Sequence, residues 1–178
     1  MRNVILTGFM GTGKSSVGRV LARLTGWVLL DLDAMIVRRG GRSINELFAQ
    51  EGEPFFRALE SAEIGMLRQY HEPFILATGG GAVLAAENRV IFRDLGLVVN
   101  LTAPPEVISA RLRHSDDRPL LNDGAAREKV ELMLREREPC YEEADIRIDT
   151  AGKKIEDVAA EILAFLTRGV TSGIEAEG

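Results

Sequence analysis

A glycine-rich segment near the N-terminus has the residue types and spacing of a phosphate-binding loop. The residues from Gly8 to Ser15 read GFMGTGKS and match the pattern G-x-x-x-x-G-K-[ST]. In such a loop the glycines let successive backbone N–H groups point at phosphate oxygens, the lysine reaches the terminal phosphates, and the hydroxyl after it ligates Mg²⁺. The sequence therefore predicts a nucleoside triphosphate site, with Lys14 on the phosphates and Ser15 on the metal ion.

Two acidic residues follow the second apolar run of the chain. Trp27 to Leu30 reads as a buried strand, and Asp31 and Asp33 come directly after it. Carboxylates two residues apart in an extended chain point to the same face. One could hold Mg²⁺ through its waters, and the other could accept a hydrogen bond from an attacking hydroxyl. The alternative is that both acids only cap the next helix, but their place beside a phosphate-binding loop favours a role in the chemistry.

Three consecutive glycines, Gly79-Gly80-Gly81, follow a third apolar run from Phe74 to Thr78. Glycines there would let the backbone approach a ligand closely. In α/β sheets, ligands bind beyond the carboxyl ends of parallel strands, which is where this segment falls. The alternative is a flexible turn between a strand and a helix, and the position favours ligand contact.

A phosphate-binding loop indicates a nucleotide but not a function. Three classes of protein are compatible with it: a small-molecule kinase, a GTPase switch, and one module of a larger ATPase machine. The guanine-reading segment Asn-Lys-x-Asp expected of a GTPase is absent from the sequence, and a larger machine usually needs more than 178 residues. These observations favour a small-molecule kinase.

The motifs, taken in order along the chain, resemble the shikimate kinase family. The match runs to about Arg168, and its segments are specific in combination. The matching segments are Gly8 to Ser16, Asp31-Leu32-Asp33, Gly52-Glu53 with Phe56-Arg57 and Glu60, Gly79-Gly80-Gly81, Arg118-Pro119-Leu120-Leu121, and Arg137-Glu138-Pro139-Cys140-Tyr141.

This resemblance implies ATP-dependent phosphorylation of the 3-hydroxyl of shikimate, a step toward chorismate and the aromatic amino acids. At the acceptor end, it implies that Asp33 takes the shikimate hydroxyls and serves as the candidate base or orienting group. Arg57 and Arg137 would pair with the substrate carboxylate, because a guanidinium fork matches a carboxylate. Backbone of Gly79, Gly80 and Gly81 would complete the contacts.

At the nucleotide end, the resemblance implies that ATP is the phosphate donor and Mg²⁺ the cofactor. Asp31 would support Mg²⁺ beside Ser15, Arg118 would close from a lid onto the phosphates, and an adenine contact would fall at Lys153 or Lys154. Arg111 and Arg113 could also contact adenine, although we expect solvated arginines at a helix end. The residues expected to bind the nucleotide are Gly11, Thr12, Gly13, Lys14, Ser15, Ser16, Arg118 and Lys153.

Other interpretations stay open for single residues and for the whole chain. Arg57 could extend from its helix into solvent, and Arg137 could pair with a nearby acid such as Glu142. A gluconate-type sugar-acid kinase would share the phosphate-binding loop but take another acceptor. A nucleotide-gated binding protein would hold ATP without turnover.

The apolar pattern predicts the elements that must position these residues. Strands are expected at 4–6, 27–30, 74–78, 97–101 and 146–149. A helix follows the loop and stops at Gly26, Ser43 and Glu46 form a capping box for a short helix that Gly52 closes, and Pro54 starts another helix. A helix starts at Pro104-Pro105, and a final helix runs from Ile155 to a stop at Gly169.

Strands alternating with helices indicate a parallel α/β sheet covered on both faces. The resemblance implies a three-layer P-loop NTPase fold, similar to nucleoside-monophosphate kinases, with a five-stranded parallel sheet in the order 2-3-1-4-5. We expect one kinase domain at 1–168, with a substrate-binding lobe at 33–70, a lid at 114–124 and a disordered tail at 169–178.

Composition narrows the setting and the partners. The net charge is −5 and the pI about 5.2, which argues against nucleic acid or an anionic membrane surface as the main partner. Cys140 is the single cysteine, so no internal disulfide can form, and a reducing compartment is expected. No apolar run is long enough to span a membrane. We therefore expect a cytoplasmic enzyme with small-molecule partners, acting as a monomer.

Overall fold

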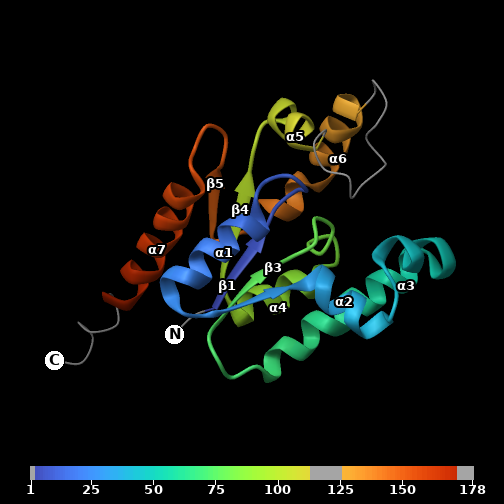
Figure 1. Ribbon diagram of the computed structural model, residues 1–178, viewed down its shortest axis with the longest axis horizontal. Coiled ribbons are helices and arrows are strands. Elements are labelled where there is room, and N and C mark those ends of the chain that lie inside the picture. The colour runs from blue at the N-terminus through green and yellow to red at the C-terminus, as the bar shows by residue number, and fades with distance from the viewer. Residues whose placement is uncertain (1–2, 113–125, 172–178) are drawn as a thin grey trace.

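A five-stranded parallel sheet forms the centre of the protein in the computed structural model, which describes residues 3–112 and 126–171 (Figure 1). The strand order is β2-β3-β1-β4-β5, and every neighbouring pair is parallel. This confirms the predicted α/β fold class and strand order. The strands are β1 (Asn3–Thr7), β2 (Val28–Asp31), β3 (Phe74–Ala77), β4 (Gly96–Thr102) and β5 (Ile146–Asp149).

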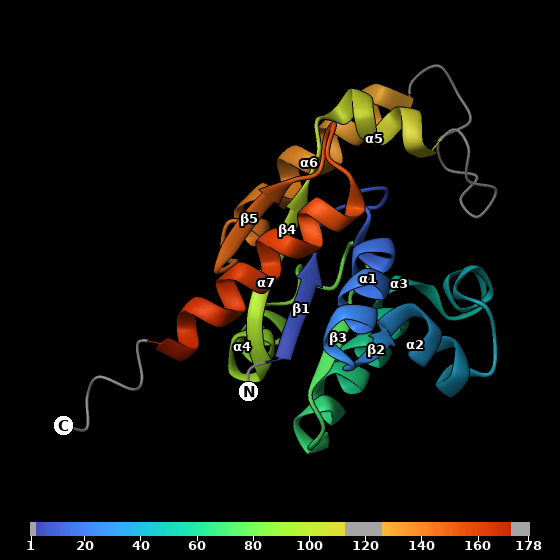
Figure 2. The same ribbon diagram turned by 60° about the vertical axis from the view of Figure 1, so that its left-hand side comes forward.

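Helices cover both faces of the sheet, giving three layers (Figure 2). Strands buried on both sides read as continuous apolar runs, and alternate residues of β1 face opposite layers. Val4 and Leu6 pack with α1 and α7, whereas Ile5 packs with α3 and α4. The helices are α1 (Lys14–Thr25), α2 (Leu32–Gly40), α3 (Ile44–Met66), α4 (Ala86–Leu95), α5 (Pro105–Leu112), α6 (Ala126–Tyr141) and α7 (Ile155–Thr171), with a 3₁₀ turn at Leu67–Gln69.

Helix α3 contains the two helices that the sequence predicts between Ser43 and Met66. Ser43 and Glu46 form the expected capping box at its start. Gly52 has φ 82° and ψ 170°, a conformation outside the helical region, so the axis kinks there. Pro54 then sits in the first turn of the second half, where its missing N–H costs nothing. This second half carries Arg57 and Glu60 to the centre of the site.

The predicted ends of the first and last helices can be compared with the structure. Gly26 ends α1 in the left-handed conformation, with φ 74° and its N–H on the carbonyl of Ala22, as expected. Helix α7 continues to Thr171, so the predicted stop at Gly169 is wrong. The predicted lid at 114–124 lies outside the described residues. The disordered tail predicted at 169–178 is wrong for residues 169–171, which belong to α7, and its remainder from 172 lies outside the described residues. None of the helices in the described ranges is long and apolar enough to cross a membrane.

Candidate active site

The phosphate-binding loop joins β1 to α1 and is shaped by glycines with positive φ. Gly8, Gly11 and Gly13 have φ values of 134°, 77° and 95°. A Cβ at Gly8 would also overlap the carbonyl oxygen of Leu101, so only glycine fits there. Thr12 is buried and its hydroxyl donates to the carbonyl of Phe9 at 2.8 Å, which closes the loop from behind. The predicted loop is therefore present with its curvature set by the backbone.

Lys14 opens α1 and lies inside this loop. Its Nζ donates to the carbonyls of Gly8 at 2.7 Å and Phe9 at 2.9 Å. Gly13 caps the helix without a side-chain hydrogen bond, so the first N–H groups of α1 are not occupied by a capping side chain. Unfilled N–H groups at a helix N-terminus favour an anion, and the ammonium adds positive charge beside them. This is the arrangement that a triphosphate requires.

The oxygen ligands proposed for Mg²⁺ come from α1 and from the end of β2. Ser15 lies in the first turn of α1. Asp31 ends β2 and caps α2, where its Oδ1 accepts from the N–H of Ala34 at 3.1 Å, and its role in holding Mg²⁺ stays a prediction. Within the ranges that the structure describes, His, Cys, Asp and Glu form no group of three able to hold a metal ion. A hydroxyl and a carboxylate oxygen still fit Mg²⁺, because that ion keeps several waters and shares substrate phosphates.

The glycine triplet after β3 lies against the side chains of Asp33 and Arg57 and against the backbone of the phosphate-binding loop. A Cβ on Gly79 would stand 2.9 Å from the carboxylate of Asp33, and one on Gly80 would stand 3.4 Å from the N–H nitrogen of Met10. A Cβ on Gly81 would stand 2.6 Å from Nη1 of Arg57. Side chains at these positions would push away the acid and the arginine. Close packing therefore requires glycine beside Asp33 and Arg57, and the ligand contact of the triplet stays a prediction.

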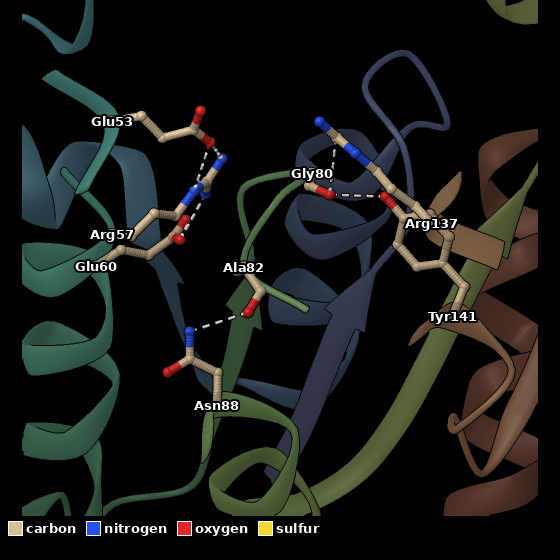
Figure 3. A network of polar contacts seen from close by, with 8 residues as sticks. All are labelled: Glu53, Arg57, Glu60, Gly80, Ala82, Asn88, Arg137 and Tyr141. Atoms are coloured by element: carbon tan, nitrogen blue, oxygen red, sulfur yellow. Dashed lines mark hydrogen bonds and ion pairs between the residues drawn. The ribbon is translucent and has the colours of Figure 1, made fainter. Parts of the chain in front are cut away.

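Arg57 is held between two glutamates on its own helix (Figure 3). Its guanidinium donates to Glu60 at 2.7 Å and to Glu53 at 3.1 and 3.2 Å. Glu60 is 1% exposed, whereas the side chain of Glu53 is 60% exposed. Burial raises the pKa of Glu60, Arg57 opposes this, and the charge of Asp33 adds to the rise. Burial works against the charge of Arg57, but the hydrogen bonds and charges of both glutamates outweigh it and raise its pKa.

Arg137 reaches the same region from α6 on the other side of the triplet (Figure 3). Its Nη1 donates to the carbonyl of Gly80 at 3.3 Å, and its guanidinium lies 5.5 Å from the ring centre of Phe9. The hydroxyl of Tyr141, one helical turn later, donates to the same carbonyl at 2.7 Å. Burial raises the pKa of Tyr141 to about 12, so the phenol stays protonated and remains a donor at neutral pH. Arg137 thus faces the site rather than pairing with Glu142.

The other residues considered for the nucleotide side are arginines and lysines near α5, the lid and the turn after β5. Arg111 is exposed near the end of α5, as expected, and it also donates to the carbonyl of Gly11 and to Thr150, each at 3.0 Å. This arginine ties the phosphate-binding loop to the turn after β5. Lys153 pairs with Glu161 at 2.7 Å, and its adenine contact stays a prediction. Arg113 and Arg118 lie outside the described residues.

Comparison with known proteins decides the family. The sequence model described as shikimate kinase matches residues 10–167. Shikimate kinase from Geobacter metallireducens is 54% identical over 166 residues, which cover 93% of this chain and 92% of that protein. The chain belongs to the shikimate kinase family. Shikimate kinase from Geobacter sulfurreducens is 53% identical, over 93% of this chain and 91% of the relative.

Solved structures agree with membership of the shikimate kinase family. Shikimate kinase from Acinetobacter baumannii in complex with shikimate superposes with a TM-score of 0.88 at 37% identity, covering 95% of this chain and 94% of that one. A gluconokinase from Sinorhizobium meliloti superposes with a TM-score of 0.64 at 19% identity, over 99% of this chain and 98% of the other. The second likeness shows a shared fold and nothing about the acceptor.

Two supporting residues of this shikimate kinase site have no assigned role in the sequence interpretation. Glu60 stands three residues after Arg57, a spacing that puts both on one helix face and could have revealed the pair. Tyr141 meets Gly80 across 61 positions, and only the folded chain brings them together. No pattern of neighbouring residues predicts that the phenol of Tyr141 is buried against the glycine triplet.

Proposed function

We propose that this member of the shikimate kinase family transfers the γ-phosphate of ATP to the 3-hydroxyl of shikimate between the phosphate-binding loop and the group formed by Asp33, Arg57 and Arg137. The supporting observation is the glycine triplet. Gly79 borders Asp33, Gly80 borders both Arg137 and the loop residue Met10, and Gly81 borders Arg57. An acceptor bound at this triplet lies next to the donor loop.

The carboxylate of shikimate binds to Arg57 and Arg137. Arg57 has a buried partner in Glu60 and an exposed partner in Glu53. An incoming carboxylate can replace exposed Glu53 without disturbing the buried pair, which keeps the guanidinium in place. Arg137 is oriented by Gly80 from the opposite side. Two guanidinium groups held from separate helices recognise a carboxylate and fix the orientation of the ring.

The hydroxyl to be phosphorylated lies at Asp33. The carboxylate of Asp33 lies against Gly79 and close enough to Glu60 to raise its pKa. There it accepts a hydrogen bond from the 3-hydroxyl and takes its proton as the phosphate bond forms. Phosphoryl transfer depends mainly on alignment and on positive charge around the moving group. The N–H groups of the loop and Lys14 supply this charge.

The proposal also includes residues for the metal ion, the phosphates and the adenine. Ser15 and Asp31 hold Mg²⁺, which when bound neutralises charge on the β- and γ-phosphates. Ser16 completes the phosphate contacts, Arg118 acts from a lid at 114–124, and Lys153 lies on the adenine side. Ser16 accepts a hydrogen bond from Arg19 at 3.1 Å, so its hydroxyl can still donate to a phosphate. The enzyme works as a cytoplasmic monomer.

A coupled assay of ADP release tests the proposed acceptor. Shikimate, quinate and gluconate are compared side by side at equal concentration with ATP and Mg²⁺. We expect turnover with shikimate far above that with the other two acids. Turnover confined to gluconate would indicate a sugar-acid kinase, and ATP binding without turnover on any acceptor would indicate a nucleotide-gated binding protein. Either result would overturn the proposal.

A further inference from the structure

Arg89 joins two parts of the proposed acceptor site that are far apart in the chain. It stands near the start of α4, and its side chain is 18% exposed. Its Nη1 donates to the carbonyls of Val83 at 2.8 Å and Leu84 at 3.2 Å, and its Nε donates to Glu143 at 2.8 Å. Val83 and Leu84 belong to residues 79–84, which we call the acceptor turn, and Glu143 lies two residues after the end of α6. The guanidinium therefore holds the acceptor turn and the end of α6 together.

The second half of the acceptor turn takes its hydrogen bonds from side chains of α4. The N–H groups of Ala82 and Leu84 donate within the turn, to the carbonyls of its first and third glycines at 3.2 and 3.0 Å. The carbonyl of Ala82 accepts from Asn88 at 3.0 Å (Figure 3), and the next two carbonyls accept from Arg89. A buried carbonyl without a partner is costly, so these two side chains fix the path of the turn.

The other end of the link is the stretch of α6 that contains Arg137 and Tyr141. Both side chains donate to the carbonyl of Gly80 (Figure 3). Arg89 contacts the same stretch, because its Nη1 lies 3.8 Å from Sγ of Cys140, the residue before Tyr141. The acceptor turn and α6 are therefore joined at two points, at Gly80 and at Arg89.

A second arginine on α4 provides a matched comparison. Arg93, one turn after Arg89, pairs with Glu143 at 3.3 Å, and its side chain is 50% exposed. Among the described residues, it donates to no carbonyl of the acceptor turn. Exposed ion pairs contribute little, whereas hydrogen bonds from a largely buried guanidinium are stronger. Arg93 therefore has the same charge and the same glutamate partner as Arg89 without the link to the turn.

We propose that Arg89 is a positioning residue for the acceptor. By joining the acceptor turn to the end of α6, it sets where the guanidinium of Arg137 lies relative to the backbone of the glycine triplet. This role rests on the proposed function, in which Arg137 binds the carboxylate of the acceptor. Arg89 acts through Arg137 and Gly80 and takes no part in the transfer of phosphate, so its loss should affect binding of the acceptor and not the chemical step.

Arg89→Met tests this role, because methionine keeps an unbranched side chain but lacks the guanidinium. We expect the KM for shikimate to rise about five- to tenfold, while kcat and the KM for ATP change by less than about twofold. Arg93→Met should leave all three values unchanged. Arg89→Lys keeps the charge but not the planar fork that reaches two segments, so it should recover only part of the loss. An unchanged KM for shikimate in Arg89→Met, or an equal rise in the KM for ATP, would contradict the proposal.

Glu143→Gln is a milder variant that removes only the charge binding Arg89 to the end of α6. Glu143 is partly exposed, so the variant should fold, and the KM for shikimate should rise in the same direction by about two- to threefold. In the double variant Arg89→Met with Tyr141→Phe, the KM should rise by less than the product of the two single effects, because both residues position the same stretch of α6 against the turn. Fully multiplicative effects would mean that Arg89 acts elsewhere.

Amide hydrogen exchange without substrates separates this role from the choice of acceptor. The N–H groups of Ala82 and Leu84 are hydrogen-bonded inside the acceptor turn. Arg89→Met should speed their exchange by about tenfold, whereas Arg93→Met should not. Unchanged exchange in Arg89→Met would refute the link whatever the acceptor is. If wild type phosphorylates shikimate and Arg89→Met does so with the same KM, only the positioning role fails and the proposed function stands.

Discussion

Arg57 and Arg137 differ in how they are held. Arg57 is fixed within its own helix by Glu53 and Glu60, whereas Arg137 is fixed by a backbone carbonyl 57 residues away. The first arrangement is local and survives small movements of the sheet. The second depends on the position of Gly80, which Tyr141 also holds. At the scale of single residues, the proposed acceptor site therefore has one arginine held within its own helix and one held by long-range packing.

Arg57→Ala should weaken acceptor binding and leave the nucleotide site intact. Removing one partner of a desolvated charge pair costs about 2–5 kcal/mol, so the KM for shikimate should rise at least about 30-fold. The KM for ATP should change by less than about twofold. Steady-state kinetics with each substrate varied gives both values.

Arg39→Ala is the matched control, because Arg39 forms an ion pair of the same length with Glu63, away from the acceptor triplet. It should leave both KM values unchanged. An equal loss of ATP and shikimate binding in Arg57→Ala would mean that Arg57 is only a structural residue.

Asp33→Asn should fold and bind ATP but lose turnover. The amide keeps the size of the side chain beside Gly79, yet it cannot take the proton of the attacking hydroxyl. We expect kcat to fall by about 10²-fold or more, the usual contribution of general base catalysis. Fluorescence titration with a nucleotide analogue checks ATP binding, and unchanged turnover would remove Asp33 from its proposed role.

Tyr141→Phe tests whether the hydrogen bond from the Tyr141 hydroxyl holds the carbonyl of Gly80 in place. The variant loses one neutral hydrogen bond, and we expect the free energy of unfolding to fall by about 1 kcal/mol. The KM for shikimate should rise several-fold while kcat stays nearly constant, because Arg137 loses its alignment but no reacting group is removed.

The Tyr141→Phe effect should be the same from neutral to mildly alkaline pH, since the pKa of Tyr141 is about 12. Tyr70→Phe, at a tyrosine that is 42% exposed, is the control and should change none of these quantities. A loss in kcat alone would contradict a positioning role.

Most elements follow from local patterns. The first four strands are mainly apolar runs, whereas β5 alternates isoleucine with charged residues. The capping box at Ser43 marks the start of α3 from its letters alone. Helix α6 is harder, because its residues are strongly charged and it contains Pro139. The motif at its end, from Arg137 to Tyr141, can be recognised in the sequence, but the helix that carries it is not predicted. The wrong stop at Gly169 has a simple reason, since glycine inside a helix costs only about 1 kcal/mol.

The kink of α3 at Gly52 should matter for both the stability of the protein and the position of Arg57. Gly52 adopts φ 82° and ψ 170°, a region open almost only to glycine. Gly52→Ala should therefore lower the free energy of unfolding by about 1–3 kcal/mol and raise the KM for shikimate, because the second half of α3 carries Arg57.

Gly65→Ala in the same helix is the control, since a Cβ there meets nothing within 4 Å. It should stabilise the protein by up to about 1 kcal/mol. Urea denaturation of the two variants measures both effects. Equal stabilisation by both substitutions would show that the kink is not needed.

The whole molecule brings together segments that are far apart in the chain. The phosphate-binding loop, the acid after β2, the triplet after β3 and the end of α6 meet beyond the carboxyl ends of the central strands (Figure 1). Strand order explains this, because β1 lies between β3 and β4. The motifs and the order of strands could be predicted from sequence and resemblance. The contacts of Arg111 with Gly11 and of Tyr141 with Gly80 could not, since they arise from packing between distant elements.

The stability of the whole chain should carry a pH signature of Glu60. Burial raises the pKa of this glutamate in the folded protein above the ordinary value of 4.5. The folded state then binds the proton more tightly than the unfolded chain. The contribution of Glu60 to the free energy of unfolding therefore falls as pH rises from the unfolded-state pKa to the folded-state pKa. Above the folded-state pKa this contribution no longer changes with pH.

Glu60→Gln removes this dependence. The wild-type free energy of unfolding minus that of the variant should fall across the same interval and then stay constant, as measured by urea denaturation at steps from about pH 2 to pH 8. Glu46→Gln provides a control of opposite sign. Hydrogen bonds from Ser43 lower the pKa of Glu46, so its contribution is lost as pH falls, and the corresponding difference should rise with pH. If the Glu60→Gln difference did not change with pH, the charges of Arg57 and Arg137 would fully offset burial and the charge of Asp33, and the expected rise in the pKa of Glu60 would be contradicted.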